Sequence, residues 1–96
     1  MFPNARVSRA AYDLGSTLRS EGDYPAAAQA FESAASRSGP DRGRAARATL
    51  SAGEMYDLAQ QRNTAIKKYE EVIAMDGDSP DGREARRLMK KPLRLP

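Results

Sequence analysis

The sequence predicts an all-α fold in which a helical hairpin is repeated in tandem. Seventeen of the 96 residues are alanine, whereas isoleucine and valine contribute only two residues each. Alanine has the highest helix propensity, and β-branched residues favour strands. The sequence also resembles itself when it is shifted by 38 residues. Because a chain of this length forms a single small core, we expect one domain over residues 1–96.

The 38-residue period aligns residues of distinctive type, with every gap preserved. The matched pairs are Gly15 and Gly53, Ala27 and Ala65, Phe31 and Tyr69, Glu32 and Glu70, and Gly39 and Gly77. Such agreement is unlikely to arise from composition alone, and it is typical of repeat proteins. We therefore expect one repeat over about residues 8–41 and a second over about residues 46–79.

The first repeat is predicted to contain two helices. Apolar residues follow three- and four-residue spacing from Val7 to Leu18, and Gly22 then interrupts the pattern, so the first helix should end near Glu21. Asp23 can cap the second helix, which should end before residues 39–40.

The second repeat and the C-terminal segment follow the same rules. Apolar stripes over residues 45–59 and 65–73 predict two helices, separated by a turn at residues 61–63. Ser79 and Pro80 then supply a cap and a first-turn proline for a closing helix over about residues 80–91. Residues 92–96 are expected to be a frayed tail.

Glycines in the middle of predicted helices need a packing explanation. Gly15 and Gly53 each cost about 1 kcal/mol relative to alanine, so we expect a close approach of another helix at both positions. Ala27 and Ala65 are the expected partners. Aromatic residues such as Phe31 should fill the wider space between helix pairs.

Several motifs resemble the tetratricopeptide repeat, a helix-turn-helix unit. They are Ala11-x₂-Leu14-Gly15-x₂-Leu18, Gly22-Asp23-Tyr24 and Ala27-x₃-Phe31-x₂-Ala34 in the first repeat, and Gly53-x₂-Tyr56 and Ala65-x₃-Tyr69-x₂-Val72 in the second. Two features depart from the family pattern. The family's closing proline is replaced by glycine, and the period is 38 residues instead of about 34, which predicts one extra helical turn near residues 39–46.

The resemblance implies a right-handed α-α superhelix with a C-terminal capping helix. It also implies a concave groove, lined by the first helix of each repeat, that binds a peptide or protein segment. The residues that the resemblance places in this groove are Arg9, Tyr12, Asp13, Ser16, Arg19 and Ser20 in the first repeat, and Arg47, Leu50, Ser51, Glu54, Asp57 and Leu58 in the second. Arginines there suit a carboxylate, Tyr12 suits an aromatic anchor, and Leu50 suits an apolar side chain.

A basic C-terminal end supports an alternative function. Residues 83–96 contain six basic residues and one acidic residue, whereas residues 1–82 contain ten basic and twelve acidic residues. The candidate basic patch comprises Arg83, Arg86, Arg87 and Lys90. It suits acidic partners or phosphates without sequence specificity, but aromatic residues for base stacking are missing after Tyr69, which disfavours nucleic acid.

Missing residue types exclude several function classes. The sequence contains neither cysteine nor histidine, so disulfides, the usual zinc sites and Ser-His-Asp catalysis are excluded. We expect no enzyme activity, no metal and no cofactor. There is no apolar run long enough to span a membrane and no export signal, so we expect a soluble protein, cytoplasmic by default, or periplasmic if the chain is a fragment.

The N-terminal residues raise the question of a longer protein. Phe2-Pro3-Asn4 resembles the end of a preceding repeat. We therefore expect the chain to be the C-terminal part of a larger repeat protein. In that case the helix face around Val7 and Leu14 is incompletely covered, which would favour homo-oligomers.

Overall fold

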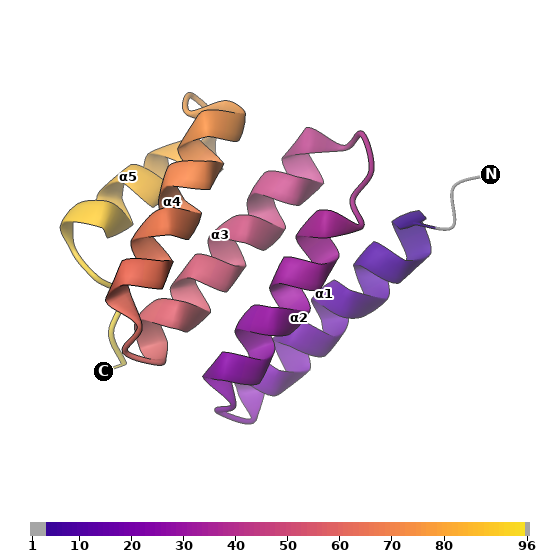
Figure 1. Cartoon of the computed structure of the whole chain (residues 1–96), viewed down its shortest axis with the longest axis horizontal. Coiled ribbons are helices and arrows are strands. Elements are labelled where there is room, and N and C mark those ends of the chain that lie inside the picture. Colours follow the sequence, from indigo (N-terminus) through magenta and orange to yellow (C-terminus); the bar gives the residue numbers. More distant parts are fainter. Residues whose placement is uncertain (1–3, 96) are drawn as a thin grey trace.

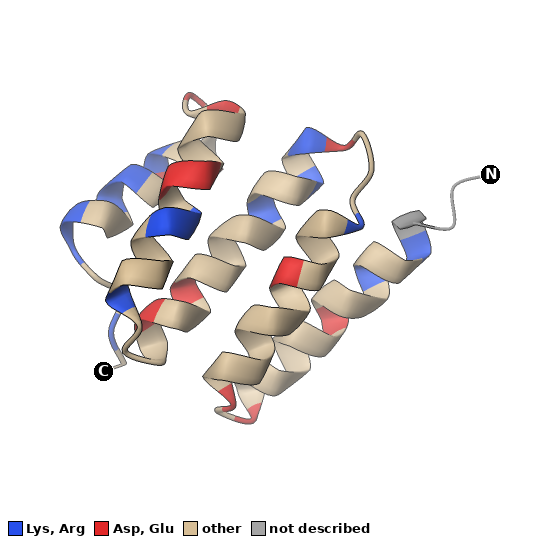
Figure 2. Ribbon diagram, viewed as in Figure 1, with Lys and Arg blue, Asp and Glu red and all other residues tan. Residues whose placement is uncertain are grey.

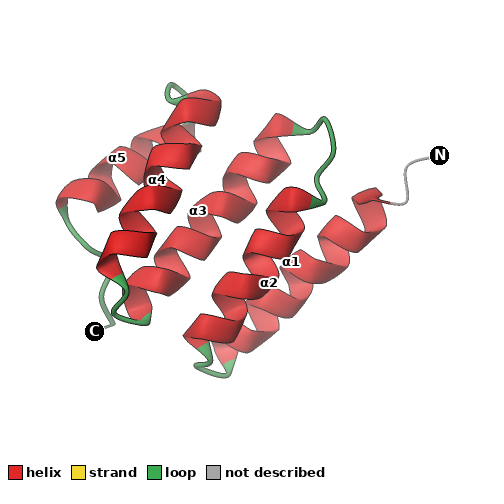
Figure 3. Ribbon diagram, viewed as in Figure 1, coloured by secondary structure: helices red, strands yellow, loops and turns green. Residues whose placement is uncertain are grey.

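The structure confirms the all-α prediction. It is a computed structural model that describes residues 4–95, and within that range every regular element is a helix (Figure 3). The five helices are α1 (Asn4–Ser20), α2 (Tyr24–Ser36), α3 (Arg42–Leu58), α4 (Arg62–Asp76) and α5 (Pro80–Lys90). Phe2 and Pro3, which we compared with the end of a preceding repeat, lie outside the described residues.

The helices form a stack in chain order. Each helix packs against the next one, and α3 also contacts α5 (Figure 1). The molecule is thin, with principal extents of 41 × 32 × 18 Å. In Figure 1, α2 and α4 lie on the near side and α1 and α5 on the far side. This stack is the tetratricopeptide-like solenoid that the sequence predicts.

The 38-residue period is also visible in the positions of the helices. α3 begins and ends 38 residues after α1, and α4 begins 38 residues after α2. Both α1 and α3 begin four residues before the predicted repeat starts at residues 8 and 46. The extra turn is therefore the first turn of α3, where the Asp41 side chain accepts a hydrogen bond from the Arg44 amide at 3.0 Å.

The predicted helix caps are confirmed. Asp23 accepts a hydrogen bond from the Ala26 amide, and the Ser79 hydroxyl accepts one from the Gly82 amide at 3.0 Å. These bonds satisfy amide groups that have no partner within a helix, and each one fixes the residue at which its helix begins.

The close approach at the two mid-helix glycines is confirmed, but the predicted partners are wrong. A Cβ atom at Gly15 would lie 2.7 Å from the Phe31 ring, and one at Gly53 would lie 2.7 Å from the Tyr69 ring. The nearest atoms thus belong to the aromatic rings and not to Ala27 or Ala65. Without a Cβ atom, each glycine leaves room for a large buried ring at the centre of its repeat.

The core consists of two apolar clusters, one whose buried members come from α2 and α3 and one whose buried members come from α3, α4 and α5. Phe31 and Met55 are the large members of the first cluster, and Tyr69, Val72 and Leu88 those of the second. Because Leu88 belongs to α5, the closing helix covers the second hairpin, as predicted. The segment after α5 is not simply frayed, since Leu93 packs against the second cluster.

The turn between α3 and α4 contains the one described non-glycine residue with a positive φ angle. Gln60 has a φ of 63°, and Gly22, the equivalent residue of the first repeat, has a φ of 80°. In both turns the next residue's amide bonds to a carbonyl five positions back, namely Leu18 and Tyr56. This is the Schellman motif, which favours glycine at that position.

Replacing Gln60 with glycine is therefore expected to raise the free energy of unfolding by about 0.5–1 kcal/mol, because glycine adopts a positive φ without the Cβ penalty. Urea unfolding followed by circular dichroism will measure the change. Gln61→Gly is the matched control, because Gln61 has a φ of −111° and gains nothing from glycine. A urea midpoint of the Gln60→Gly variant at or below that of the wild type would contradict this explanation.

Candidate peptide-binding groove

A hollow of about 340 Å³ lies between the two first helices of the repeats. The side chains that line it come from α1 (Ser8, Arg9, Tyr12 and Asp13) and from α3 (Arg44 and Arg47). The structure thus brings together four residues of the predicted groove. Three of the lining residues are arginines and one is an aspartate; Arg44 is paired with Asp41 at 3.8 Å and Arg47 with Asp81 at 3.2 Å, both outside the lining.

The Tyr12 side chain forms a rigid wall of the hollow. Its ring packs edge-to-face on Phe31, with the centroids 5.0 Å apart and an angle of 63° between the planes. Its hydroxyl lies 3.3 Å from the Ser51 hydroxyl, so a hydrogen bond connects α1 to α3. An aromatic residue held at both ends loses little conformational entropy when a ligand binds.

The arginines of the hollow differ in their surroundings. Arg9 is exposed and makes no ion pair with any residue in the described range. Arg47 lies 3.2 Å from Asp81 of α5, in a contact that is 62% exposed on the arginine side. The Arg47 side of this pair is open to solvent, whereas the Asp81 side chain is only 20% exposed.

Glu54 lies two turns beyond Arg47 on α3 and is half-buried. Burial raises the pKa of the Glu54 carboxyl; Arg19 of α1 opposes this shift and Glu84 of α5 adds to it. Arg47 and Arg87 also oppose it. The carboxyl thus lies in the combined field of charges from α1, α3 and α5, but it does not line the hollow.

The remaining predicted groove residues of α1 are Ser16, Arg19 and Ser20, and all three are exposed. Arg19 makes no ion pair within the described chain, and the Ser20 hydroxyl donates to the Ser16 carbonyl at 3.1 Å. These residues are accessible to a partner, but they do not line the hollow.

Three residues expected in the groove, Leu50, Ser51 and Asp57, are buried instead, and Ser51 is 5% exposed. Leu50 is only 5% exposed and belongs to the core cluster around Tyr69. Asp57 is 8% exposed, and Leu58 next to it is half-buried. Leu50 and Asp57 are seven residues apart and share one side of α3. That side faces α4 and α5. α3 has neighbouring helices on several sides, whereas α1 packs against α2.

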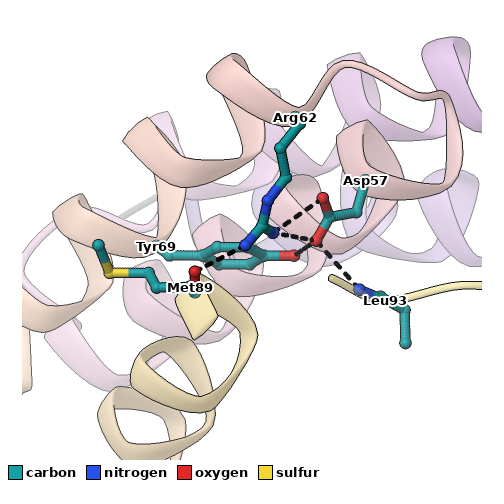
Figure 4. Close-up of polar contacts among 5 residues, drawn as sticks. All are labelled: Asp57, Arg62, Tyr69, Met89 and Leu93. Atoms are coloured by element: carbon teal, nitrogen blue, oxygen red, sulfur yellow. Dashed lines mark hydrogen bonds and ion pairs between the residues drawn. The ribbon is translucent and has the colours of Figure 1, made fainter. Parts of the chain in front are cut away.

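The buried Asp57 is the centre of a hydrogen-bond network, shown in Figure 4. Arg62 donates to both of its carboxylate oxygens, at 3.1 and 3.0 Å, and the Tyr69 hydroxyl donates at 2.6 Å. The Leu93 amide donates at 3.3 Å, and Arg62 also donates to the Met89 carbonyl at 2.7 Å. The network joins α3, α4, α5 and the C-terminal segment, so the role of Asp57 is structural.

Burial is also the main cause that raises the pKa of the Tyr69 hydroxyl, and the bond to Asp57 adds to the shift. A second tyrosine makes a similar contact, between α3 and α2. The Tyr56 hydroxyl donates to Glu32 at 2.5 Å, and burial together with this bond raises its pKa to about 12. Lys68 lies 2.8 Å from the same Glu32 carboxylate. The Tyr56 hydroxyl, the Glu32 carboxylate and the Lys68 ammonium group therefore all have partners within the protein.

Two residues that line the hollow were missed in the sequence, Ser8 and Arg44. Arg44 lies one turn before Arg47, and this three-residue spacing could have revealed it. Arg44 was not predicted because the second repeat was expected to begin at residue 46. Ser8 gave no signal, and its hydroxyl is occupied by the Ala34 carbonyl at 2.8 Å.

The predicted basic patch lies on the exposed side of α5 (Figure 2). Arg87 forms two hydrogen bonds of 2.7 Å with Glu84, and Arg86 donates to the Gly77 carbonyl at 3.0 Å. Arg83 and Lys90 make no ion pair in the described part of the chain. Arg87 therefore has a counter-ion within the protein, and Arg86 has a neutral hydrogen-bond acceptor.

A family model described as tetratricopeptide repeat matches residues 4–42 and, in a second alignment, residues 12–80. This chain belongs to the tetratricopeptide repeat family. Tetratricopeptide repeats generally act as protein–protein interaction modules without catalytic activity. Comparisons with curated proteins and with solved structures gave no match.

Two further findings concern the described part of this tetratricopeptide repeat chain. None of its helices is long and apolar enough to cross a membrane. Residues 4–95 also contain no group of three or more acidic side chains placed to hold a metal ion.

Proposed function

We propose that this tetratricopeptide repeat chain is a non-catalytic interaction module that binds an extended segment of a partner protein between α1 and α3. The observation that carries this proposal is the hollow of about 340 Å³, which both helices line and whose lining includes three arginines and one aspartate. An arginine-lined hollow with a rigid aromatic wall suits an acidic side chain or a chain terminus.

Specific side chains have distinct roles in this proposal. Arg9 and Arg47 bind a carboxylate of the segment, since a guanidinium donates two parallel hydrogen bonds to it. The Tyr12 ring supports the adjacent peptide unit. Glu54 lies about 10 Å from Arg47 along α3 and accepts a hydrogen bond from a basic residue of the segment. An extended chain covers that distance in about three residues, which sets the expected spacing of the acid and the base.

A second candidate function rests on the cations of α5 that have no partner in the described chain. Arg83 and Lys90 are exposed and two turns apart, so they lie on one side of the helix. They suit an acidic surface or a phosphate backbone, with affinity that decreases steeply as salt is added.

Selection from a random octapeptide phage library tests both functions. We expect the wild-type chain to enrich peptides that contain an acidic residue. With a selected peptide, Arg9→Glu is expected to weaken binding at least tenfold at physiological salt, as judged by fluorescence anisotropy. Arg83→Glu is the matched control, because it reverses one exposed charge of the same kind, and it should leave the affinity within about twofold.

A double-mutant cycle then locates the contact. In the Arg9→Glu variant, replacing the acidic residue of the peptide by its amide should change the affinity little, because the arginine that binds this acid is already absent. Loss of binding in Arg83→Glu but not in Arg9→Glu would favour the second candidate. Enrichment of no peptide at all would overturn the groove proposal.

A further inference from the structure

The outer side of α1 carries an apolar stripe that no described helix covers. Val7 is 38% exposed and Leu14 is 53% exposed. They are two helical turns apart, and the exposed Ala10 lies between them on the same side. The described helix against which α1 packs is α2, and Figure 1 shows α1 at the end of the stack.

The opposite end of the stack does not suit this stripe. α5 presents Arg83, Arg86 and Lys90 on its exposed side. Head-to-tail stacking of two copies would therefore desolvate these cations against Val7 and Leu14, which is unfavourable without counter-charges. A second copy offers a better surface in its own α1, because apolar residues then meet apolar residues.

An antiparallel pairing of two α1 helices makes the stripe complementary to itself. With a two-fold axis between Ala10 and Ala11, Val7 of each copy faces Leu14 of the other. Alanines lie at the crossing point, where small side chains let helices approach closely.

The charges beside the stripe match the same arrangement. Arg6 and Asp13 are both exposed, lie on one flank of the stripe and make no ion pair in the described part of their own chain. A two-fold axis perpendicular to the paired helices keeps equivalent flanks on the same side. Arg6 of each copy then lies beside Asp13 of the other, which gives two ion pairs. A parallel pairing would separate these charges by about two helical turns.

We infer that two copies of this chain associate through the Val7–Leu14 side of α1 in antiparallel orientation. Arg9 and Tyr12 lie roughly 140–160° around α1 from Leu14, given 3.6 residues per turn. The hollow between α1 and α3 consequently stays open in both copies. Asp13 belongs both to the lining of the hollow and to the dimer contact, but the dimer does not depend on the proposed peptide binding.

Sedimentation equilibrium of the full chain over a range of concentrations tests the dimer. The mass is expected to rise from 10.5 kDa towards twice that value, with a dissociation constant on the order of 10–100 µM for a small interface. Leu14→Glu should remain monomeric at every concentration. Leu95→Glu is the matched control and should still dimerise, because Leu95 is 58% exposed and lies outside this side of α1.

A charge exchange tests the orientation. Arg6→Glu and Asp13→Arg should each weaken the dimer several-fold, and the variant with both changes should restore it, because the ion pairs reform with reversed sign. A monomer at all concentrations would overturn the inference, as would a dimer that Leu14→Glu leaves intact. A dimer that does not respond to the charge changes would overturn the antiparallel arrangement.

Discussion

Replacing Asp57 with alanine is expected to lower the free energy of unfolding by about 3–5 kcal/mol. The change removes the acceptor of four hydrogen bonds, leaves the Tyr69 hydroxyl without its partner, and leaves the Arg62 guanidinium without its counter-ion and with only its bond to the Met89 carbonyl. A buried charge that loses its counter-ion costs more than the pair itself contributes. Urea unfolding followed by circular dichroism measures the loss.

The control for Asp57→Ala is Glu70→Ala, which removes an exposed carboxylate of α4 and should change stability by less than about 0.5 kcal/mol. Hydrogen exchange adds a local readout. The Leu93 amide donates to Asp57, so it should lose its protection in Asp57→Ala and keep it in Glu70→Ala. Equal stability of the two variants would show that the network does not hold α5 and the C-terminal segment in place.

Replacing Gly53 with leucine is expected to lower the free energy of unfolding by about 3 kcal/mol. Even a Cβ atom at this position would lie 2.7 Å from the Tyr69 ring and 3.1 Å from Lys68 Cβ. The ring is fully buried and its hydroxyl is bound to Asp57, so it cannot move aside without breaking that bond. Overpacking of this kind outweighs the helix propensity that leucine adds.

Gly43→Leu is the matched control for Gly53→Leu, because both glycines belong to α3. A Cβ atom at Gly43 has only an ordinary contact, 3.6 Å from the Asp41 carboxylate. The control should therefore raise the free energy of unfolding by up to about 1 kcal/mol through helix propensity alone. If thermal unfolding shows that Gly53→Leu is also more stable than the wild type, then the space beside the glycine is not needed for the ring.

The groove shows where sequence-based prediction succeeds and where it fails. Tyr12 and Arg47, which the family resemblance assigned to the groove, both line the hollow between α1 and α3. Leu50 was assigned to the same surface, although it is buried. Periodicity gives the direction of a side chain around its helix, but it does not give the number of neighbours that enclose that helix.

The sequence by itself determined the local structure of this protein. Helix propensity, the caps at Asp23 and Ser79 and the 38-residue period act over a few neighbouring residues or by comparison of the chain with itself, so they need no tertiary information. They were sufficient to predict two helical repeats and a closing helix, and the resemblance to the tetratricopeptide repeat added the expected stack.

Only the tertiary structure decided the roles of individual polar and aromatic residues. Asp57 looks like any helical surface acid in the sequence, yet it binds Arg62 from the next helix and the Leu93 amide from 36 residues away. The Phe31 ring lies against Gly15 because two helices bring these residues together. A buried carboxylate and an exposed one, or a ring in a core and a ring on a surface, differ only in their neighbours, and these neighbours come from distant parts of the chain.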